Sequence, residues 1–460
     1  MKTEMHVSTF ARASYRDGLV AVFHQLRPVV TYLSAARWEQ YLTSPESDVG
    51  LDARLIETGI LVQHQDDGGA LTRYRDDTKH RLSRPTILYL MLAQGCNNVC
   101  VGCPVPVLAA KHGNKLLTRE NALAGVKFWQ RQLADWDDGG SFHLLFYGGE
   151  PLLNRSVLEA SIAYVADQRL NGHLPAKTEM SVPTNGRLID ASLANLFARN
   201  RVSVVVGMDG PPDLNDAVRV TTEGLGTSAE IERSVRILLE NKVSTGASVT
   251  LTPSNVREAT RIREYIRSLG IYDFGFNVLK GSALAVQLGE MTEKEYFHLV
   301  AEAVLSGYDE NANVQNEYQL RKRLDALDQH LPFALDCTCF GNQLVVQPDG
   351  MVSNCPFDRV DAGSIQTLPK DFTIADSQVV AEWRTSIPLL TSSQPTTANT
   401  FIHAGSCGFG SRSVSPGTDV ALFNEEVMHG LIWKRLPPGA TEGLQSGRDS
   451  YWSDRRLGAL

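Results

Sequence analysis

Gly95-Cys96-Asn97-Asn98-Val99-Cys100-Val101-Gly102-Cys103 is the stretch that decides the fold of this chain. It gathers three of the seven cysteines into eight residues, with the spacing Cys-x3-Cys-x2-Cys. No fourth cysteine or close histidine accompanies them, so a tetrahedral zinc site would lack a local ligand. Three thiolates can instead hold three irons of a 4Fe-4S cube and leave the fourth iron open. A zinc site or a chance grouping is the alternative.

The composition is that of a soluble globular protein. At 460 residues, the chain has room for two or three domains of roughly 150 residues each. The formal charge of -8 excludes a general basic field for nucleic acid. The sequence has no apolar run of about 18 residues and no signal-peptide pattern, so we expect a cytoplasmic protein without membrane contact. In that compartment, clustered cysteines more often bind metal than form disulfides.

From Thr86 onward, short apolar runs alternate with segments of helical period. The predicted strands are Thr86–Leu92, Phe142–Tyr147, Glu179–Val182, Val202–Val206, Ala247–Leu251 and Phe274–Val278. The predicted helices are Thr118–Trp136, Ser156–Leu170, Ala191–Arg199, Ala229–Asn241 and Val256–Leu269. Such alternation favours parallel pairing with right-handed crossovers. The fold class is therefore α/β, and six units predict a partial (β/α)6 barrel.

Four motifs follow successive predicted strands. They are the cysteine loop, Gly148-Gly149-Glu150-Pro151, Thr184-Asn185-Gly186 and Asp209-Gly210-Pro211. The carboxyl ends of the strands form the active face of a parallel β/α barrel. The two glycines let the backbone approach a ligand, and Glu150 offers an anionic partner for an ammonium group. In isolation, each motif is also compatible with an ordinary turn.

The cysteine spacing together with Gly148-Gly149-Glu150-Pro151 resembles the radical S-adenosylmethionine (SAM) enzymes. The resemblance implies a 4Fe-4S cluster on Cys96, Cys100 and Cys103, which cleaves SAM to a 5′-deoxyadenosyl radical. It also implies SAM contacts from Gly148, Gly149, Glu150, Asn185 and Arg219. One departure is Gly102, because the family usually has an aromatic residue there.

Met208-Asp209-Gly210-Pro211 resembles the Ser-x-Asp-Gly-Pro stretch of sulfatase maturases and other radical SAM peptide-modifying enzymes. In that family, a serine and an arginine twelve residues later help to hold SAM. Arg219 stands at the arginine position, and its guanidinium suits bidentate capture of a carboxylate. The serine position is Gly207, so that contact is missing or made by backbone. A surface ion pair is the alternative role of Arg219.

A second cysteine group lies near the carboxyl end. Cys339-x10-Gly350-x4-Cys355 resembles the opening of SPASM and Twitch extensions, which carry auxiliary iron-sulfur clusters. Pro348-Asp349-Gly350 predicts a hairpin turn between these two cysteines. With Cys337 and Cys407 the set has four thiols, which suffice for one auxiliary 4Fe-4S cluster. His403 could replace a ligand, the choice between Cys337 and Cys339 stays open, and a structural zinc site is the alternative.

Five segments follow from these patterns. They are an N-terminal module at 1–84, the radical SAM barrel at 85–285, a helical linker at 286–330, an auxiliary cluster domain at 331–425 and a tail at 426–460. In the first, Leu19–His24 and Pro28–Leu33 predict a hairpin and Ala35–Leu42 a short helix. This segment is either a plain β-rich module or an element that binds a peptide leader by strand addition.

The resemblance implies an oxidoreductase that modifies a peptide or protein, making a crosslink, an oxidised residue or an epimer. A sulfatase-type formylglycine maturase, or a radical dehydrogenase of a small sugar or alcohol, is the alternative. From another class, a non-enzymatic metal-binding module would fit the cysteines alone. The expected partners are a peptide substrate and an electron donor such as a flavodoxin or ferredoxin. No substrate-side catalytic residue can be named, since Tyr147 and Asp209 also suit structural roles.

Overall fold

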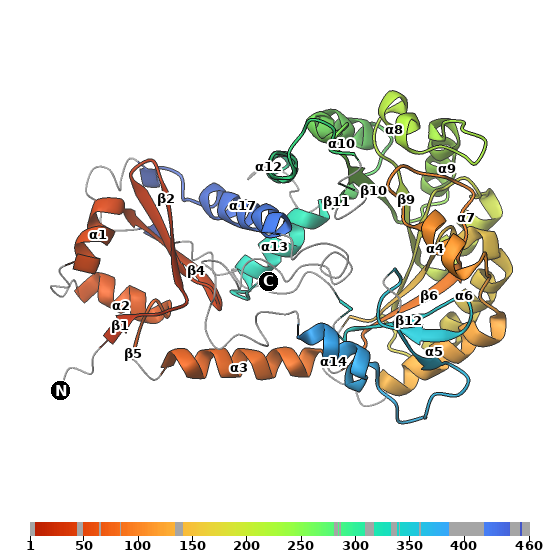
Figure 1. Ribbon diagram of the computed structural model, residues 1–460, viewed down its shortest axis with the longest axis horizontal. Coiled ribbons are helices and arrows are strands. Elements are labelled where there is room, and N and C mark those ends of the chain that lie inside the picture. Colours follow the sequence, from red (N-terminus) through yellow and green to blue (C-terminus); the bar gives the residue numbers. More distant parts are fainter. Residues whose placement is uncertain are drawn as a thin grey trace.

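In the computed structural model, the chain forms an α/β fold around one large, mostly parallel sheet (Figure 1). The structure describes residues 5–43, 49–63, 66–82, 84–133, 141–279, 284, 287–308, 317–332, 338–339, 341–357, 360–385, 418–441 and 451–452. The six predicted strands are confirmed as β6 (Ile87–Ala93), β7 (His143–Gly148), β8 (Glu179–Thr184), β9 (Val202–Gly207), β10 (Thr245–Leu251) and β11 (Asp273–Val278). Each pairs in parallel with the next.

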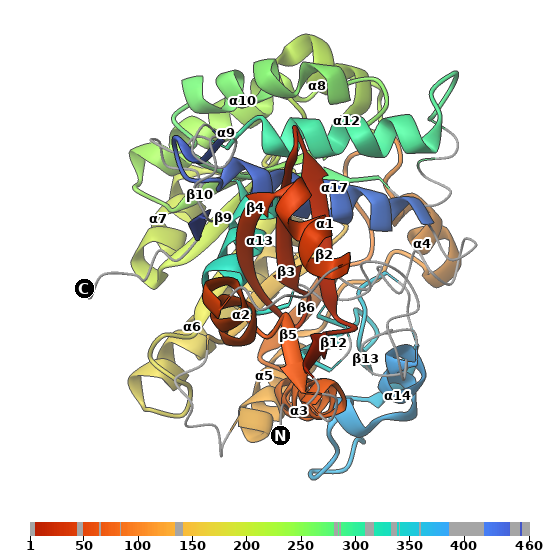
Figure 2. The same ribbon diagram turned by 90° about the vertical axis from the view of Figure 1, so that its left-hand side faces the viewer.

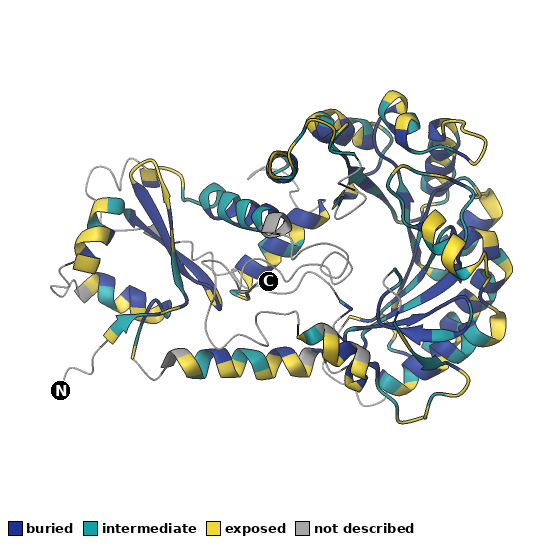
Figure 3. Ribbon diagram, in the orientation of Figure 1, coloured by how far each residue is buried: buried dark blue, intermediate teal, exposed yellow. Residues whose placement is uncertain are grey.

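Helices connect these strands and cover one face of the sheet. They are α4 (Val105–His112), α5 (Arg119–Leu133), α6 (Arg155–Leu170), α7 (Ala191–Asn200), α8 (Pro212–Val218), α9 (Ser228–Glu240) and α10 (Ala259–Ser268), with short 3-10 turns η1 (Pro151–Asn154) and η2 (Val256–Glu258). Strand β9 shows the two-sided pattern, because Val202, Val204 and Val206 are buried while Ser203 and Val205 are half-buried. Apolar burial under the helices therefore fixes which face of each strand looks inward (Figure 3).

The sheet continues past the barrel into the carboxyl-terminal part of the chain. Strand β12 (Gln343–Val346) pairs in parallel with β6, then antiparallel with β13 (Met351–Ser353), which pairs with β14 (Asp361–Ser364). The predicted hairpin is confirmed, and Gly350 in its turn has φ +81°. Helix α5 covers this junction at Gly125, where a Cβ would lie 2.7 Å from Val346 Cγ2. The two cysteine-bearing parts thus share one nine-stranded sheet.

The N-terminal module is a separate antiparallel sheet with flanking helices. Strands β2 (Ala11–Arg16), β3 (Leu19–His24) and β4 (Arg27–Ser34) form a meander, and β15 (Tyr451–Trp452) adds to the outer edge of β4. Strands β1 (Met5–Val7) and β5 (Leu61–Gln63) form a second small sheet. Helices α1 (Ala35–Thr43), α2 (Val49–Glu57) and α3 (Asp66–Arg81) complete it. The hairpin and first helix were predicted, whereas α3 was not.

Helix α17 (Thr418–Lys434) lies between the module and the barrel in Figure 1, and Figure 2 shows it running behind the meander. It contacts the module through Trp433, whose Nε1 donates to Ser14 Oγ at 2.9 Å, and through the Tyr32 hydroxyl, which donates to the Ile432 carbonyl at 2.5 Å. On the barrel side it packs against α12 (Glu293–Leu305), near α13 (Tyr318–Asp328). The boundary expected at residue 425 therefore lies inside a helix.

After β14 the chain forms the short turn η4 (Ile374–Asp376) and helix α14 (Gln378–Arg384). Within the part of the chain that the structure describes, no helix combines the length and apolar character needed to cross a membrane.

Candidate functional site

The three cysteines of the loop between β6 and α4 lie close together. Burial is the main reason why the pKa of each thiol is raised, and the negative charge of a neighbouring thiolate raises it further. This neighbour is Cys100 for Cys96, Cys103 for Cys100 and Cys96 for Cys103. Repulsion of this kind requires thiolates that approach one another. The loop thus collects its thiols at the carboxyl end of β6.

Backbone hydrogen bonds hold this loop against the chain that follows α8. Val99 N donates to Val220 O at 2.8 Å, and Val101 N donates to Val218 O at 2.9 Å. These two hydrogen bonds flank Arg219, and its positive charge counteracts the rise in the pKa of both Cys100 and Cys103.

The three thiols suit an iron-sulfur cluster, which takes cysteine thiolates as its ligands. A tetrahedral zinc ion draws its sulfur ligands to roughly 3.8 Å from each other. Among the described residues, no group of three His, Cys, Asp or Glu side chains is placed to bind one metal ion. In addition, Nδ2 of Asn98, a residue of this loop, is buried without a hydrogen-bond partner in the described part of the chain. Three neighbouring thiols and an unused buried donor suit a larger, sulfur-rich group.

The diglycine turn after β7 packs directly on the cysteine loop. Gly149 N donates to Ala93 O at 2.8 Å, and Glu150 N donates to Gly95 O at 3.0 Å. Gly148 has φ +142°, and a Cβ there would lie 2.3 Å from Ala93 O. A Cβ on Gly149 would lie 2.2 Å from Gly95 O. Both positions therefore require glycine, because backbone atoms fill the space that a side chain would need.

Glu150 is a fully buried carboxylate with protein donors around it. Leu152 N, Thr184 Oγ1 and Asn185 N donate to its oxygens at 3.0, 2.8 and 2.8 Å. Burial nevertheless raises the pKa of Glu150 to about 6. The negative charge of Glu150 in turn raises the pKa of Cys96, after the larger effect of burial on that thiol. A carboxylate of this kind would gain from a cation bound beside it.

Arg219 forms a two-pronged ion pair with Asp209. Its Nε and Nη2 bond to the two carboxylate oxygens at 2.8 and 3.0 Å, and Thr250 N also donates to Asp209 Oδ1 at 2.7 Å. The Arg219 side chain is only 14% exposed, so this is not a surface ion pair. A Cβ on Gly207 would lie 2.7 Å from Arg219 Nη1. The guanidinium thus occupies the space into which a serine at position 207 would project.

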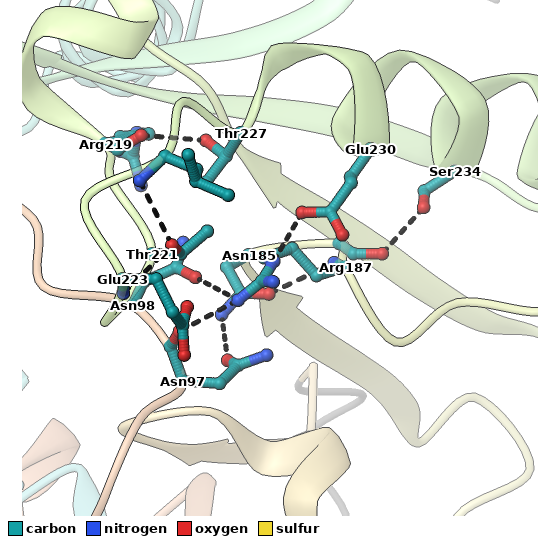
Figure 4. A network of polar contacts seen from close by, with 12 residues as sticks. Asn97, Asn98, Asn185, Arg187, Arg219, Thr221, Glu223, Thr227, Glu230 and Ser234 are labelled. Carbon is teal, nitrogen blue, oxygen red and sulfur yellow. Dashed lines mark hydrogen bonds and ion pairs between the residues drawn. The ribbon is translucent and has the colours of Figure 1, made fainter.

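Asn185 turns toward the cysteine loop (Figure 4). Its Nδ2 donates to Asn97 Oδ1 at 2.7 Å and to Cys96 Sγ at 3.6 Å. Arg187, two residues later, donates from Nη1 to Asn97 O at 2.8 Å and to Asn98 Oδ1 at 3.1 Å. The sequence reasoning missed Arg187 and the asparagines of the loop. The available signal was the position of Arg187, directly after Thr184-Asn185-Gly186 at the end of a strand.

Cys339 and Cys355 of the second group are both buried and share one apolar cluster with residues of the N-terminal module. The other members of that cluster are Phe10, Leu26, Leu71 and Leu82. Asn354 Nδ2 donates to Cys339 O at 3.0 Å and so ties the two cysteine segments together. The other expected ligands, Cys337, Cys407 and the substitute His403, lie outside the described residues.

Tyr147 stands between the two cysteine groups. Its ring meets Tyr89 and Phe357 edge to face, with centroids 5.6 and 5.9 Å away. Burial, and then the charges of Cys103 and Cys355, raise the pKa of Tyr147 to about 12. The phenol therefore stays protonated at neutral pH and is a hydrogen-bond donor rather than a base.

Comparisons with known proteins give one matching family model and several similar proteins. Residues 90–266 match the Radical SAM superfamily. The cysteine-type anaerobic sulfatase-maturating enzyme of Clostridium perfringens (strain 13 / Type A) is 28% identical over 306 residues, which cover 62% of this chain and 78% of that protein. The radical SAM cyclopropyl synthase TigE of Paramaledivibacter caminithermalis is 24% identical over 250 residues, which cover 50% of each protein.

Solved structures show the same fold. Native anSMEcpe with bound AdoMet aligns with a TM-score of 0.59 at 19% identity and covers 78% of this chain and 99% of its own. Native anSMEcpe with bound AdoMet and the Cp18Cys peptide aligns with a TM-score of 0.57 at 18% identity and the same coverage.

Proposed function

Because residues 90–266 form a radical SAM domain, we propose that this chain cleaves SAM reductively and uses the resulting radical to modify a peptide. When bound, a 4Fe-4S cluster supplies the electron for that cleavage. Cys96, Cys100 and Cys103 hold the cluster and leave one iron open. The observation that carries the proposal is the meeting of these thiols with the diglycine turn at the carboxyl ends of parallel strands.

The remaining site residues orient SAM. Gly148 and Gly149 present backbone groups without a Cβ in the way, and Glu150 pairs with the SAM ammonium, which offsets the cost of its own burial. Asp209 occupies Nε and Nη2 of Arg219, so Nη1 is left for the SAM carboxylate. Asn185 holds the cysteine loop and lies within reach of the ribose side of the site.

Cys337, Cys339, Cys355 and Cys407 hold one auxiliary 4Fe-4S cluster in this proposal. Burial of Cys339 and Cys355 and the position of Tyr147 between Cys103 and Cys355 support a second cofactor facing the same region. Such a cluster would accept an electron from the substrate radical or bind the substrate.

A peptide substrate agrees with the relatives, one of which is named as a sulfatase-maturating enzyme, and with a solved fold neighbour that holds a peptide. In the N-terminal module, strand β2 lies at the end of its sheet, with no further strand beside it among the described residues, and it has several exposed residues. An extended leader segment would add there through backbone hydrogen bonds. A flavodoxin or ferredoxin would supply the electron.

A sulfatase-type formylglycine maturase is the second candidate. The 28% identity to the Clostridium perfringens enzyme favours it. The resemblance associates those enzymes with two auxiliary clusters, whereas this chain has only four cysteines outside the first motif.

Anaerobic reconstitution tests the proposal. The chain should hold about eight irons and release 5′-deoxyadenosine from SAM under reductant. Replacement of Cys96, Cys100 and Cys103 by alanine should abolish SAM cleavage, while Cys355→Ala should spare cleavage and impair peptide turnover. Zinc without labile sulfide, or retained cleavage in the triple variant, would refute the proposal.

Mass spectrometry of candidate peptides separates the possible outcomes. Loss of two hydrogens indicates a crosslink or an oxidation, and deuterium uptake without another mass change indicates epimerisation. Loss of sulfur from a cysteine-containing sulfatase peptide identifies the formylglycine maturase.

A further inference from the structure

Amide N–H groups surround the sulfurs of the first cysteine motif. Cys96 Sγ accepts from the backbone N–H of Asn98 at 3.4 Å and from Asn185 Nδ2 at 3.6 Å. Burial raises the pKa of Cys103, and the backbone N–H of Val105 acts against that rise. For Cys100 burial is again the largest influence on the pKa, and the Asn98 amide is among the groups that lower it.

The orientation of the Asn98 side-chain amide is set by its hydrogen bond with Arg187. Its side chain is buried, and its Nδ2 has no hydrogen-bond partner among the described residues. Its Oδ1 accepts from Arg187 Nη1 at 3.1 Å. The oxygen of an amide side chain accepts hydrogen bonds, whereas its NH2 group donates them. The hydrogen bond from the Arg187 guanidinium therefore fixes Oδ1 toward Arg187, and the NH2 group points away from Arg187. The Asn98 side chain is also among the groups that lower the pKa of Cys100, as expected for an NH2 group on the side of that sulfur.

Arg187 is itself fixed from two sides (Figure 4). Its Nε bonds to Glu230 Oε2 on α9 at 2.5 Å, and its Nη1 also donates to Asn97 O at 2.8 Å. Asn185 Nδ2 donates to Asn97 Oδ1 at 2.7 Å, so Asn185 and Arg187, both in the loop after β8, donate hydrogen bonds to Asn97. The cysteine loop is therefore attached to the end of β8 and to α9 by side chains that only this arrangement brings together.

We propose that Asn98 and Asn185 tune the reduction potential of the cluster held by Cys96, Cys100 and Cys103, and that Arg187 is the positioning residue for Asn98. Reduction adds one negative charge to the cluster, which its sulfur ligands share. N–H donors aimed at those sulfurs stabilise the reduced form and raise the potential. The inference rests on the radical SAM domain and needs no assumption about the peptide.

The test is an anaerobic redox titration followed by electron paramagnetic resonance. SAM is the probe, because it perturbs only the signal of the cluster that binds it. Asn98→Leu should shift the one-electron equilibrium about tenfold toward the oxidised form, which corresponds to a potential lower by about 59 mV. Arg187→Gln should shift it in the same direction. Iron content is measured for each variant alongside.

Arg233→Gln is the matched control. It removes a guanidinium from α9 whose Nη2 donates to the Arg187 carbonyl at 3.3 Å, so the cysteine loop keeps its contacts. The reduction potential of the SAM-binding cluster in the Arg233→Gln variant should equal that in the unaltered chain. Arg187→Lys separates charge from orientation, because lysine keeps the charge but lacks the planar fork. We expect it to leave most of the Arg187→Gln shift in place.

Two results would overturn the inference. One is an unchanged potential in a fully loaded Asn98→Leu chain. The other is complete rescue by Arg187→Lys, which would leave only a charge effect. Should Asn98→Leu not assemble the cluster, Asn185→Leu measured in the same way decides, and an unchanged potential there refutes the tuning role. Absence of any SAM-sensitive signal in the unaltered chain would instead refute the proposed function.

Discussion

At the scale of single residues, the site contains two buried charged groups, Glu150 and Arg219, whose charges are only partly compensated by neighbouring protein groups. Glu150 is buried with three donors on its oxygens, yet its pKa stays raised to about 6. Arg219 remains charged beside two thiols because Asp209 counters the lowering of its pKa by burial. A zwitterionic ligand with an ammonium and a carboxylate would complete both balances.

The raised pKa of Glu150 predicts that SAM binding depends on pH. A bound ammonium needs the ionised carboxylate, and protonation below pH 6 removes it. With a pKa of about 6, the affinity for SAM should be roughly fourfold lower at pH 5.5 than at pH 7.5. Calorimetric titration of reconstituted protein measures this. Glu150→Gln should bind weakly at both values, and a Gln variant with the same pH profile would show that Glu150 is not the titrating group.

Gly207→Ser predicts a local collision rather than a restored contact. The new Cβ would lie 2.7 Å from Arg219 Nη1, so the guanidinium has to leave its position over Asp209. We expect about tenfold weaker SAM binding, equal to about 1.4 kcal/mol. Gly68→Ser is the matched control, because nothing lies within 4 Å of a Cβ there. Tighter SAM binding in Gly207→Ser would contradict the prediction.

At the scale of elements, the turn after β7 and the loop after β6 form one unit joined by backbone hydrogen bonds. The Gly149→Ala methyl would lie 2.2 Å from Gly95 O, a backbone atom that cannot rotate away. We expect a free energy of unfolding lower by roughly 1–3 kcal/mol and loss of bound iron from the first motif. Thermal unfolding and iron analysis measure both. Gly68→Ala should behave as the unaltered chain, and a normally loaded Gly149→Ala protein would show that the loop can relax.

The elements that sequence predicted are those with a strong local pattern. Six apolar runs gave β6 to β11, and turn residues such as Pro348-Asp349-Gly350 gave the hairpin of β12 and β13. Helix α3 was missed because its sequence is largely charged and shows no apolar stripe. Helix α17 was not predicted, and its sequence contains Gly430, a residue that is unfavourable inside a helix. In the fold, Gly430 allows close packing, with a Cβ there 2.3 Å from Leu305 Cδ1.

The site divides in the same way. The positions of the three cysteines and Glu150 at the ends of strands could be predicted, because each belongs to a short motif that directly follows an apolar run. Arg187 and Glu230 could not, because 43 residues separate them and their pairing depends on how α9 packs beside β8. Nor does any local signal announce that β12 joins β6, which links segments more than 250 residues apart through strand pairing.

At the scale of the whole molecule, the parallel pairing of β12 with β6 joins the carboxyl-terminal part of the chain to the barrel sheet. A chain that ends at residue 330 would leave β6, an apolar strand, with an unpaired edge. We expect this truncated chain to aggregate in size-exclusion chromatography. A chain that ends at residue 441 keeps the nine-stranded sheet and should remain monodisperse. A monodisperse shorter chain would show that β6 tolerates an open edge.

Strand β15 occupies part of the outer edge of β4, with Tyr451 opposite Tyr32 and Trp452 opposite Thr31. Any other extended segment that binds at this edge must therefore compete with β15 of the same chain. A competitor that belongs to the same chain acts at a high effective concentration, because its binding is intramolecular. The affinity of an extended segment for the full chain should therefore be lower than its affinity for a β4 edge without β15. Release of β15 from β4 would then strengthen the binding of such a segment.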